Sequence, residues 1–529
     1  MARHLSETDA GPLAGWQLAI VATMSHAPLI VAWVAIPGAF QFGHLVAMPL
    51  VYVLGGLTLL CAALTFTSMA RRVRHPGGLY ALVSHGLGPA AGLGVAAVVL
   101  ISYLGSLVSL YAVFALTFSA LMSDALGMHV PVEAAAIVGA AVISLLGLVP
   151  LRRVIWLLGG LLTAQLVVLI WFDVRALQLP MEHEDFIAPL HPGWLFSGSF
   201  GIALCFAVTA FIGLDTSLNF VRDVRHPRRA VPFAAYLAGA LMTLASAFSA
   251  WAVGAATSGQ ARAAVAPDDV AASAGTTGQS LFTLIGRIVG PEGAPGVGRL
   301  IMWTLLLATV GTAVVLHKAV NRQLAGLAGD GVLPPSFGLG AGGPVRLIVP
   351  GVAALGTLAV VATGDRIYAL WLGLASGLGI TGALTLTSIG AVFWFLRTGE
   401  NESGVGGWEI RVVAGALATV VTGFVFGFGL LNLTSVFPPA GGRPSWLLGA
   451  LIGLAFVFGV VAALILRAVR PGVYASIGRA AGASADPGPG VVPGGPGARM
   501  SVAAQDRTGN QANVPWTETS SFPADAVAE

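Results

Sequence analysis

Hydrophobic positions along this chain fall into long runs between residues 14 and 468, and few charged side chains interrupt them. A helix rises about 1.5 Å per residue, so about 20 apolar residues span the hydrocarbon core of a bilayer. The pattern therefore predicts about twelve membrane-spanning helices. They cover residues 14–35, 46–69, 91–122, 131–150, 154–177, 198–224, 231–256, 299–326, 346–363, 367–397, 410–435 and 445–468.

The composition indicates the same class of protein. Hydrophobic residues make up 56% of the 529 residues and charged residues only 9%, whereas soluble domains carry about 25% charged residues. The abundant Gly and Pro residues mark interruptions of helices when they lie inside a bilayer. The first apolar run lacks an early small-residue cleavage site, so we interpret it as the first span and not as a signal peptide. We predict an all-α polytopic membrane protein.

Basic residues predict the orientation of the spans. If the N-terminus is cytosolic, the cytosolic connections carry Arg71, Arg72, Arg74, Arg152, Arg153, Arg222, Arg225, Arg228, Arg229, Arg346 and Arg397. The opposite side collects Glu182, Glu184, Asp185, Asp268 and Asp269. The positive-inside rule then places both termini in the cytosol. We expect the protein to lie in the cytoplasmic membrane.

The remaining composition limits the partners. The pI near 9.1 reflects the charge asymmetry, and no basic cluster is interleaved with aromatic residues, so we expect no nucleic-acid binding. Cys61 and Cys205 lie in apolar runs without metal-ligand spacing and are expected to be inert. Residues 1–13 form a short cytosolic tail. Residues 471–529 are rich in Gly, Pro, Ala and Ser and are predicted to form a disordered cytosolic tail.

A short motif occurs twice, about 200 residues apart. Residues 78–89 read Gly-Leu-Tyr-Ala-Leu-Val-Ser-His-Gly-Leu-Gly-Pro, and residues 280–291 read Ser-Leu-Phe-Thr-Leu-Ile-Gly-Arg-Ile-Val-Gly-Pro. Five predicted helices separate the copies, and because five is odd the copies have opposite orientations. Either two interfacial helices are alike by chance, or the chain contains an inverted repeat, which is typical of transporters. The repeat would relate residues 14–177 to 198–397, followed by two further helices in 410–468.

Transporters with inverted repeats bind substrate near the middle of the membrane, where the first helix of each repeat is broken. The candidate residues at the two breaks are Ser25, His26, Ala27, Pro28, Phe211, Ile212, Gly213 and Asp215. Pro28 lacks an amide hydrogen, Gly213 permits unwinding, and hydrocarbon alone would reject the Asp215 carboxylate. Freed amides suit a carboxylate and freed carbonyls suit an ammonium group, so a zwitterion fits both.

Each polar candidate also has a structural interpretation. Asp215 could be a buried acid that bonds to backbone amides, and His26 could simply pack with one nitrogen bonded. Tyr103 on the third helix could face the site or pack between helices. Asp173 is expected to be a solvated charge at the end of the fifth helix. Lys318 is expected to extend its amine to the membrane interface.

Four motifs occur in a consistent order along the chain. Residues 75–80 read His-Pro-Gly-Gly-Leu-Tyr, and residues 211–215 of the sixth helix read Phe-Ile-Gly-Leu-Asp. Residues 223–232 read Asp-Val-Arg-His-Pro-Arg-Arg-Ala-Val-Pro, and residues 330–334 read Asp-Gly-Val-Leu-Pro. Together they resemble the motifs of the amino acid–polyamine–organocation superfamily, whose fold is that of the leucine transporter. Asp215 stands where that family more often has Glu.

The resemblance implies a secondary transporter that moves a small amino acid or related amine by alternating access, either coupled to protons or sodium or as an exchanger. It implies a functional monomer that holds no cofactor and no bound metal. Proton-coupled relatives often carry a Lys on the fifth helix, and this chain has none there. Thr309 and Thr312 could help to bind sodium, and His26 or Asp215 could equally carry a proton.

Other functional classes find less support in the sequence. The chain has no His-Glu-x-x-His pair and no Gly-x-Ser-x-Gly motif, so we do not expect a membrane-embedded enzyme. It has no phosphate-binding loop with a Lys, which disfavours an ATP-driven pump. A nutrient sensor that keeps the transporter fold without transporting remains the main alternative.

Overall fold

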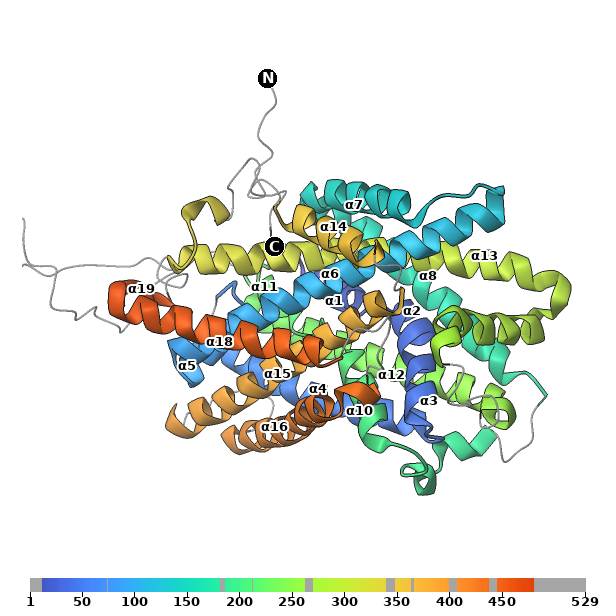
Figure 1. Ribbon diagram of the computed structural model, residues 1–529. Helices are drawn as coiled ribbons and strands as arrows, with labels where there is room; N and C mark the ends of the chain where they lie inside the picture. Colours follow the sequence, from blue (N-terminus) through green and yellow to red (C-terminus); the bar gives the residue numbers. More distant parts are fainter. Residues whose placement is uncertain are drawn as a thin grey trace, which may run out of the picture. The chain divides into compact units, whose positions relative to one another are not determined.

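The computed structural model describes residues 12–73, 75–180, 186–211, 213–261, 270–338, 348–362, 366–398, 407–436 and 445–479. Helices make up most of these ranges (Figure 1). The described residues contain no strand, and their one isolated β-bridge joins Leu13 to Val224.

The part of the chain up to Leu177 contains nine helical segments. They are α1 (Gly15–Ser25), α2 (Pro28–Ile30), a π-helical turn η2 (Val31–Ala35), α3 (Ile36–Gly43), α4 (Met48–Ala70), α5 (Leu79–Gly86), α6 (Pro89–Leu126), α7 (Val132–Leu148) and α8 (Leu151–Leu177). The first four segments together form the first span, Gly15–Gly43. The short helix α5 lies between the second and third spans. It contains most of the first motif copy, residues 78–89.

The second half begins with two short turns, η3 (Ala188–Leu190) and η4 (Pro192–Trp194). The following helices are α10 (Phe200–Thr209), α11 (Thr216–Asn219), α12 (Pro227–Ala261), α13 (Val270–Gly329), α14 (Ile348–Val361) and α15 (Arg366–Thr398). The turn η6 (Pro335–Phe337) follows α13. The chain continues with α16 (Trp408–Leu431), α17 (Leu433–Val436), α18 (Trp446–Val469) and α19 (Pro471–Ser476).

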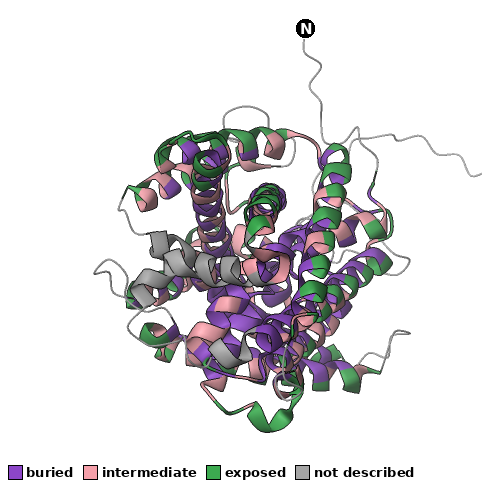
Figure 2. Cartoon of the chain, turned by 90° about the vertical axis from the view of Figure 1, so that its right-hand side faces the viewer, coloured by how far each residue is buried: buried purple, intermediate pink, exposed green. Residues whose placement is uncertain are grey.

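Length and hydropathy confirm the predicted class. Among the described residues, nine helical segments are long and apolar enough to cross a membrane, and α7, α10 and α14 are shorter apolar helices. These twelve match the twelve predicted runs. Buried residues fill the interior and exposed residues lie toward the outside (Figure 2). Many large apolar side chains of α7, α16 and α18 are exposed. Exposed apolar area of this extent is expected where a protein meets lipid.

The two copies of the repeated motif share an unusual backbone turn. Gly88 has φ 103° and ψ 164° just before α6, and Gly290 has φ 78° and ψ 165° inside α13. This region of backbone space is open almost only to glycine. In each copy the turn ends a helical segment and starts a long span with a proline at the next position. The spans therefore begin at Pro89 and Glu292, earlier than the apolar pattern predicted.

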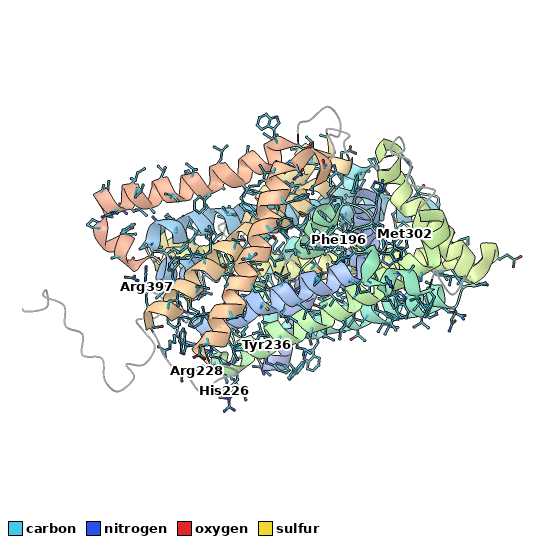
Figure 3. The ribbon with its side chains drawn as sticks, turned by 90° about the horizontal axis from the view of Figure 1, so that it is seen from below. Phe196, His226, Arg228, Tyr236, Met302 and Arg397 are labelled. Atoms are coloured by element: carbon cyan, nitrogen blue, oxygen red, sulfur yellow. The ribbon has the colours of Figure 1, made fainter. Side chains whose placement is uncertain are left out.

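Helix contacts join the repeats into one bundle. The helix α6 packs against α13, α15 and α18, and α4 packs against α12 and α16. The helix α1 contacts α8, α12 and α13. Several arginines gather at one end, which we call the basic end: Figure 3 shows Arg228 and Arg397 toward it and Phe196 and Met302 away from it.

The start of the C-terminal tail differs from the prediction of disorder. Pro471 begins α19, Ile477 is fully buried, and the Gly478 N–H donates to Asp330 Oδ2 at 2.7 Å. This short segment has apolar and backbone groups that bind the end of α13. Residues 480–529 lie outside the described residues.

The shared turn predicts the effect of adding a side chain. Gly88→Ala and Gly290→Ala should each destabilise the protein by about 1–3 kcal/mol, because alanine must adopt a backbone conformation that only glycine tolerates. The space around both positions is open, so a clash does not contribute. Gly286→Ala is the matched control, since Gly286 also has open space and is helical. Thermal unfolding of purified protein measures the difference, and equal midpoints for all three variants would contradict it.

Candidate functional site

The first span is broken where the sequence predicted it. The helix α1 ends at Ser25, and Ala27 adopts a left-handed conformation with φ 50°. Pro28 follows as the first residue of α2, where its missing N–H costs nothing. A left-handed non-glycine residue costs about 1–2 kcal/mol. The surrounding structure must hold this break in place.

The sixth span is broken between α10 and α11. Gly213 has φ 113° there, and Ile212 lies outside the described residues. A Cβ atom on Gly213 would collide with Ser25 Oγ and approach the backbone carbon of Ser25 to 2.9 Å. Glycine is therefore required both for its conformation and for the close approach of the first span.

Ser25 joins the two breaks. Its hydroxyl lies 2.7 Å from the carbonyl oxygen of Ala22, 3.0 Å from that of Gly213 and 3.0 Å from Thr216 Oγ1. Thr216 Oγ1 also donates to the Gly213 carbonyl at 2.6 Å. Carbonyls that lose their helical partners are thus bonded by hydroxyl groups, which a bilayer interior demands.

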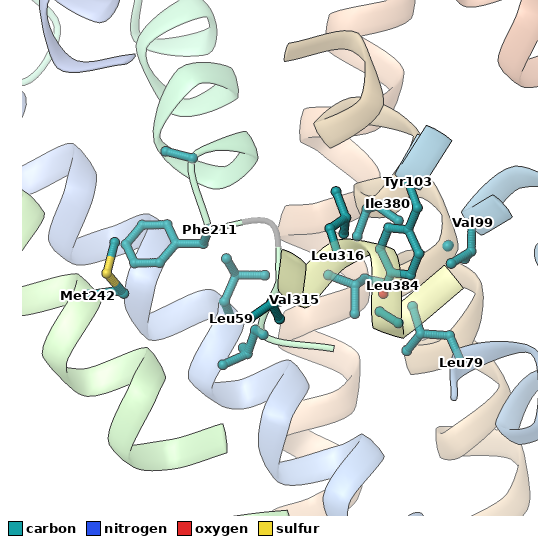
Figure 4. Close-up of a cluster of buried hydrophobic side chains, with 14 of the residues drawn as sticks. Leu59, Leu79, Val99, Tyr103, Phe211, Met242, Val315, Leu316, Ile380 and Leu384 are labelled. Carbon is teal, nitrogen blue, oxygen red and sulfur yellow. The ribbon is translucent and has the colours of Figure 1, made fainter. Parts of the chain in front are cut away.

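The acid Asp215 lies just beyond the second break and is 2% exposed. Its Oδ2 accepts a hydrogen bond from the Tyr103 hydroxyl of α6, and that hydroxyl accepts one from Asn219 Nδ2 at 3.3 Å. Asp215 Oδ1 has no hydrogen-bond partner among the described residues. Tyr103 and Phe211 belong to a buried cluster that includes Val315 and Leu316 (Figure 4). Tyr103 therefore bonds to one carboxylate oxygen, and the backbone at Gly213 and Asp215 lies close enough to the carboxylate to interact with it.

His26 follows the end of α1 and is buried. Its Nδ1 lies 2.6 Å from the Ala22 carbonyl oxygen, and because a carbonyl only accepts, Nδ1 carries the hydrogen. Its Nε2 has no partner among the described residues. The ring lies edge-on to Phe211 with centroids 6.5 Å apart. The second nitrogen can accept a hydrogen bond or bind a proton.

The two threonines of α13 have different environments. Thr312 Oγ1 donates to the carbonyl of Met24 at 2.9 Å, so it lies directly at the first break. Thr309 Oγ1 bonds to Leu305 of its own helix at 2.8 Å. On the other side of the break, Gln165 Nε2 lies 3.3 Å from the sulfur of Met24. The structure brings Thr312 to the site and leaves Thr309 bonded within its helix.

Two sequence interpretations are wrong. Asp173 is 1% exposed and accepts a hydrogen bond from Ser249 of α12 at 2.5 Å, so it is not a solvated end-charge. Lys318 is 5% exposed, and its amine donates to the carbonyls of Gly147 at 3.1 Å and Val149 at 2.6 Å. It caps the end of α7, where a cation is favoured. Both side chains are buried against neighbouring helices.

A second polar cluster closes the basic end around Asp330. Its Oδ1 lies 2.9 Å from His75 Nε2, and its Oδ2 accepts hydrogen bonds from the Tyr80 hydroxyl at 2.9 Å and the Gly478 amide at 2.7 Å. Burial and the neighbouring Asp330 carboxylate raise the pKa of Tyr80 above its ordinary value. Tyr80 therefore keeps its proton and acts as a donor. Nearby, Arg322 Nη2 pairs with Asp223 at 2.7 Å.

Sequence reasoning missed Asn219, which donates to Tyr103. The sequence signal was its amide side chain four residues after Asp215. Residues at this spacing lie on one face of a helix. The partnership with Tyr103 depends on how α6 lies against α11, which the sequence pattern does not define.

Two spans that are interrupted at mid-helix and joined at their breaks are typical of a membrane transporter. The profile named amino acid permease matches residues 20–364. That match covers more than half of the chain, so the chain belongs to the amino acid permease family. It is a membrane transporter and not an enzyme. A sequence comparison with curated proteins gives no match.

Solved structures show the same fold at low sequence identity. A mutant of the manganese transporter of Eremococcus coleocola superposes with a TM-score of 0.56 and 15% identity, over 89% of this chain and 100% of that chain. The same transporter in complex with an aromatic bis-isothiourea substituted compound gives a TM-score of 0.56 and 16% identity, over 90% of this chain and 100% of that chain. At this identity the likeness concerns the fold alone.

The hydrogen bond between Tyr103 and Asp215 predicts a measurable contribution to stability. Tyr103→Phe should destabilise the protein by about 1–3 kcal/mol, because it leaves a buried carboxylate oxygen without a donor. Tyr52→Phe is the matched control, since the Tyr52 hydroxyl is buried and has no partner among the described residues. Removing that hydroxyl should be neutral or slightly stabilising. Thermal unfolding of both variants checks the prediction, and equal losses would contradict it.

Proposed function

We propose that the chain transports a small amino acid or related amine by alternating access, as a functional monomer. The contact between Ser25 and Gly213 carries the proposal, because it joins two broken helices inside the bundle. The proposed substrate site consists of Ser25, His26, Ala27, Pro28, Tyr103, Phe211, Ile212, Gly213 and Asp215.

The polar groups at the breaks suit a zwitterion. Asp215 Oδ1 and His26 Nε2 are buried atoms without partners among the described residues. The carboxylate oxygen attracts an ammonium group. A substrate carboxylate would bind near the start of the half-helix at Pro28, because a helix N-terminus favours an anion. The Leu29 amide there lies 3.5 Å from Gln165 Oε1. The few charges at this depth disfavour a dicarboxylate or a phosphorylated substrate.

Two coupling ions would use different residues. A proton would bind to Asp215 or His26. A sodium ion would need hard oxygen ligands, which the Thr312 hydroxyl and the Met24 carbonyl offer, with Thr309 as a further candidate. Uptake into proteoliposomes under an imposed pH gradient or an imposed sodium gradient distinguishes the two.

Two alternative functions are a nutrient sensor and a metal transporter. A nutrient sensor would bind an amino acid without moving it, so binding without uptake of any radiolabelled amino acid would favour a sensor. The manganese transporter that shares the fold suggests a metal cargo. However, the described residues contain no group of three His, Cys, Asp or Glu side chains that could hold a metal ion.

The charge of Asp215 should be required for accumulation. Asp215→Asn keeps the shape and the Tyr103 contact but removes the charge, so uptake against a gradient should fall to the level of empty liposomes. Asp173→Asn is the matched control, because Asp173 is also buried but bonds to Ser249 away from the breaks. It should retain uptake. Unchanged uptake and pH dependence for Asp215→Asn would make Asp215 structural and leave His26 as the candidate.

We also propose that both termini are cytosolic, so that the basic end faces the cytosol. A protease-sensitive tag after Glu529 should be removed from inverted membrane vesicles and protected in intact cells. The same tag inserted into the connection 178–198 should show the opposite behaviour. Removal of the C-terminal tag in intact cells would reverse the orientation.

A further inference from the structure

A buried cation near the basic end has no acidic partner among the described residues. Arg411 lies in the first turn of α16 and is 3% exposed. Its guanidinium lies over the ring of Phe395, 5.9 Å from the centroid. Its Nε is buried without a hydrogen-bond partner among the described residues. Aromatic contact alone compensates only part of the cost of burying such a cation.

A second arginine, Arg71, interacts electrostatically with the same tyrosine as Arg411. Arg71 ends α4, is half-buried, and its Nε also lacks a partner in the described part of the chain. Both guanidinium groups lie close enough to the Tyr236 hydroxyl of α12 to interact with it electrostatically. Tyr236 itself pairs with Thr67 at 3.1 Å. Both cations therefore act electrostatically on the same hydroxyl group, although like charges repel one another.

Two further arginines lie over aromatic rings of α15. Arg72 lies over the ring of Trp394, 5.6 Å from its centroid, and Arg397 lies over Phe393 at 5.8 Å. We call Arg71, Arg72, Arg397 and Arg411 the arginine cluster. The acid nearest to Arg411 in the described sequence is Glu409, which is exposed and forms no ion pair with it among the described residues.

The surroundings of the arginine cluster are apolar and exposed. Its helices α4, α15 and α16 contact one another. Beside the cluster, Phe393, Leu396, Ile410 and Val413 are exposed on the outer faces of α15 and α16. Figure 3 shows Arg397 at the basic end, on the side of the bundle where Arg228 lies. Cations thus lie at the end of an apolar surface, as phosphates lie at the end of acyl chains.

We infer that the arginine cluster binds the phosphate of an anionic phospholipid in the leaflet at the basic end. The forked guanidinium groups of Arg71 and Arg411 match phosphate oxygens in geometry and charge. The acyl chains would lie along the exposed apolar faces of α15 and α16. Basic side chains between spans are a recognised basis for binding anionic headgroups. The lipid would also join α4 of the first repeat to α15 and α16.

The experiment titrates purified protein with dioleoyl phosphatidylglycerol in a neutral detergent and follows the thermal unfolding midpoint. The lipid should raise the midpoint, and dioleoyl phosphatidylcholine should not. Combined Arg71→Gln and Arg411→Gln should raise the half-saturating concentration at least about tenfold, or about 1.4 kcal/mol. Combined Arg152→Gln and Arg153→Gln is the matched control, because it removes two exposed arginines elsewhere. The control should respond like the unaltered protein.

Further arms separate the sources of phosphate. Inorganic phosphate at matched ionic strength should give no comparable shift, and equal protection would replace the lipid with a soluble anion. Equal weakening in the Arg152 and Arg153 control would reduce the effect to general surface charge and overturn the site. If the double variant does not fold, Arg71→Gln and Arg411→Lys replace it, since lysine keeps the charge and loses the fork. Unchanged titration for both would overturn the proposal.

Discussion

A polypeptide inside a bilayer must satisfy its own backbone hydrogen bonds, because hydrocarbon offers no donors or acceptors. The contact between Ser25 and Gly213 answers this constraint at the point where two spans give up their helical bonds. Each break leaves carbonyls unbonded, and the hydroxyls of Ser25, Thr216 and Thr312 bond to them. The interruption of one helix is therefore stable only when the other lies beside it. This mutual dependence places polar groups in the interior without opening it to lipid.

Buried ionisable side chains in this bundle follow several patterns. Lys318 bonds to the carbonyls that end α7. Arg322 of α13 pairs with Asp223, which lies 99 positions earlier in the connection before α12. Asp215 is satisfied at one oxygen by Tyr103. Arg411 lies over the ring of Phe395 and has no acidic partner among the described residues. Asp215 and Arg411 each keep a polar atom without a hydrogen-bond partner among the described residues. Asp215 lies in the interior beside the breaks, and Arg411 lies near the basic end beside the outer surface. A substrate suits the first position and a component of the membrane suits the second.

Much of the fold follows from one-dimensional patterns. Apolar runs of span length located all twelve helices, and Pro28 and Gly213 located both breaks, because these residues change the backbone wherever they occur. The two short sequence matches contain the same backbone turn, at Gly88 and at Gly290. Side-chain partners were harder to predict. Asp173 and Lys318 were misassigned because a helix can turn either face toward its neighbour, and sequence position defines depth better than direction. The Asn219 contact and the docking of Ile477 likewise depend on three-dimensional packing.

The bond from Gly478 to Asp330 has a consequence for the making of the protein. The two residues are 148 positions apart, so a ribosome that adds about 5–20 residues per second needs roughly 7–30 s to travel between them. During that interval Asp330 can already meet Tyr80 and His75, because both were synthesised earlier. The last donor arrives only when translation has passed the final span. The hydrogen bond from Gly478 to Asp330 therefore forms late in biogenesis, after the last span of the bundle has been synthesised.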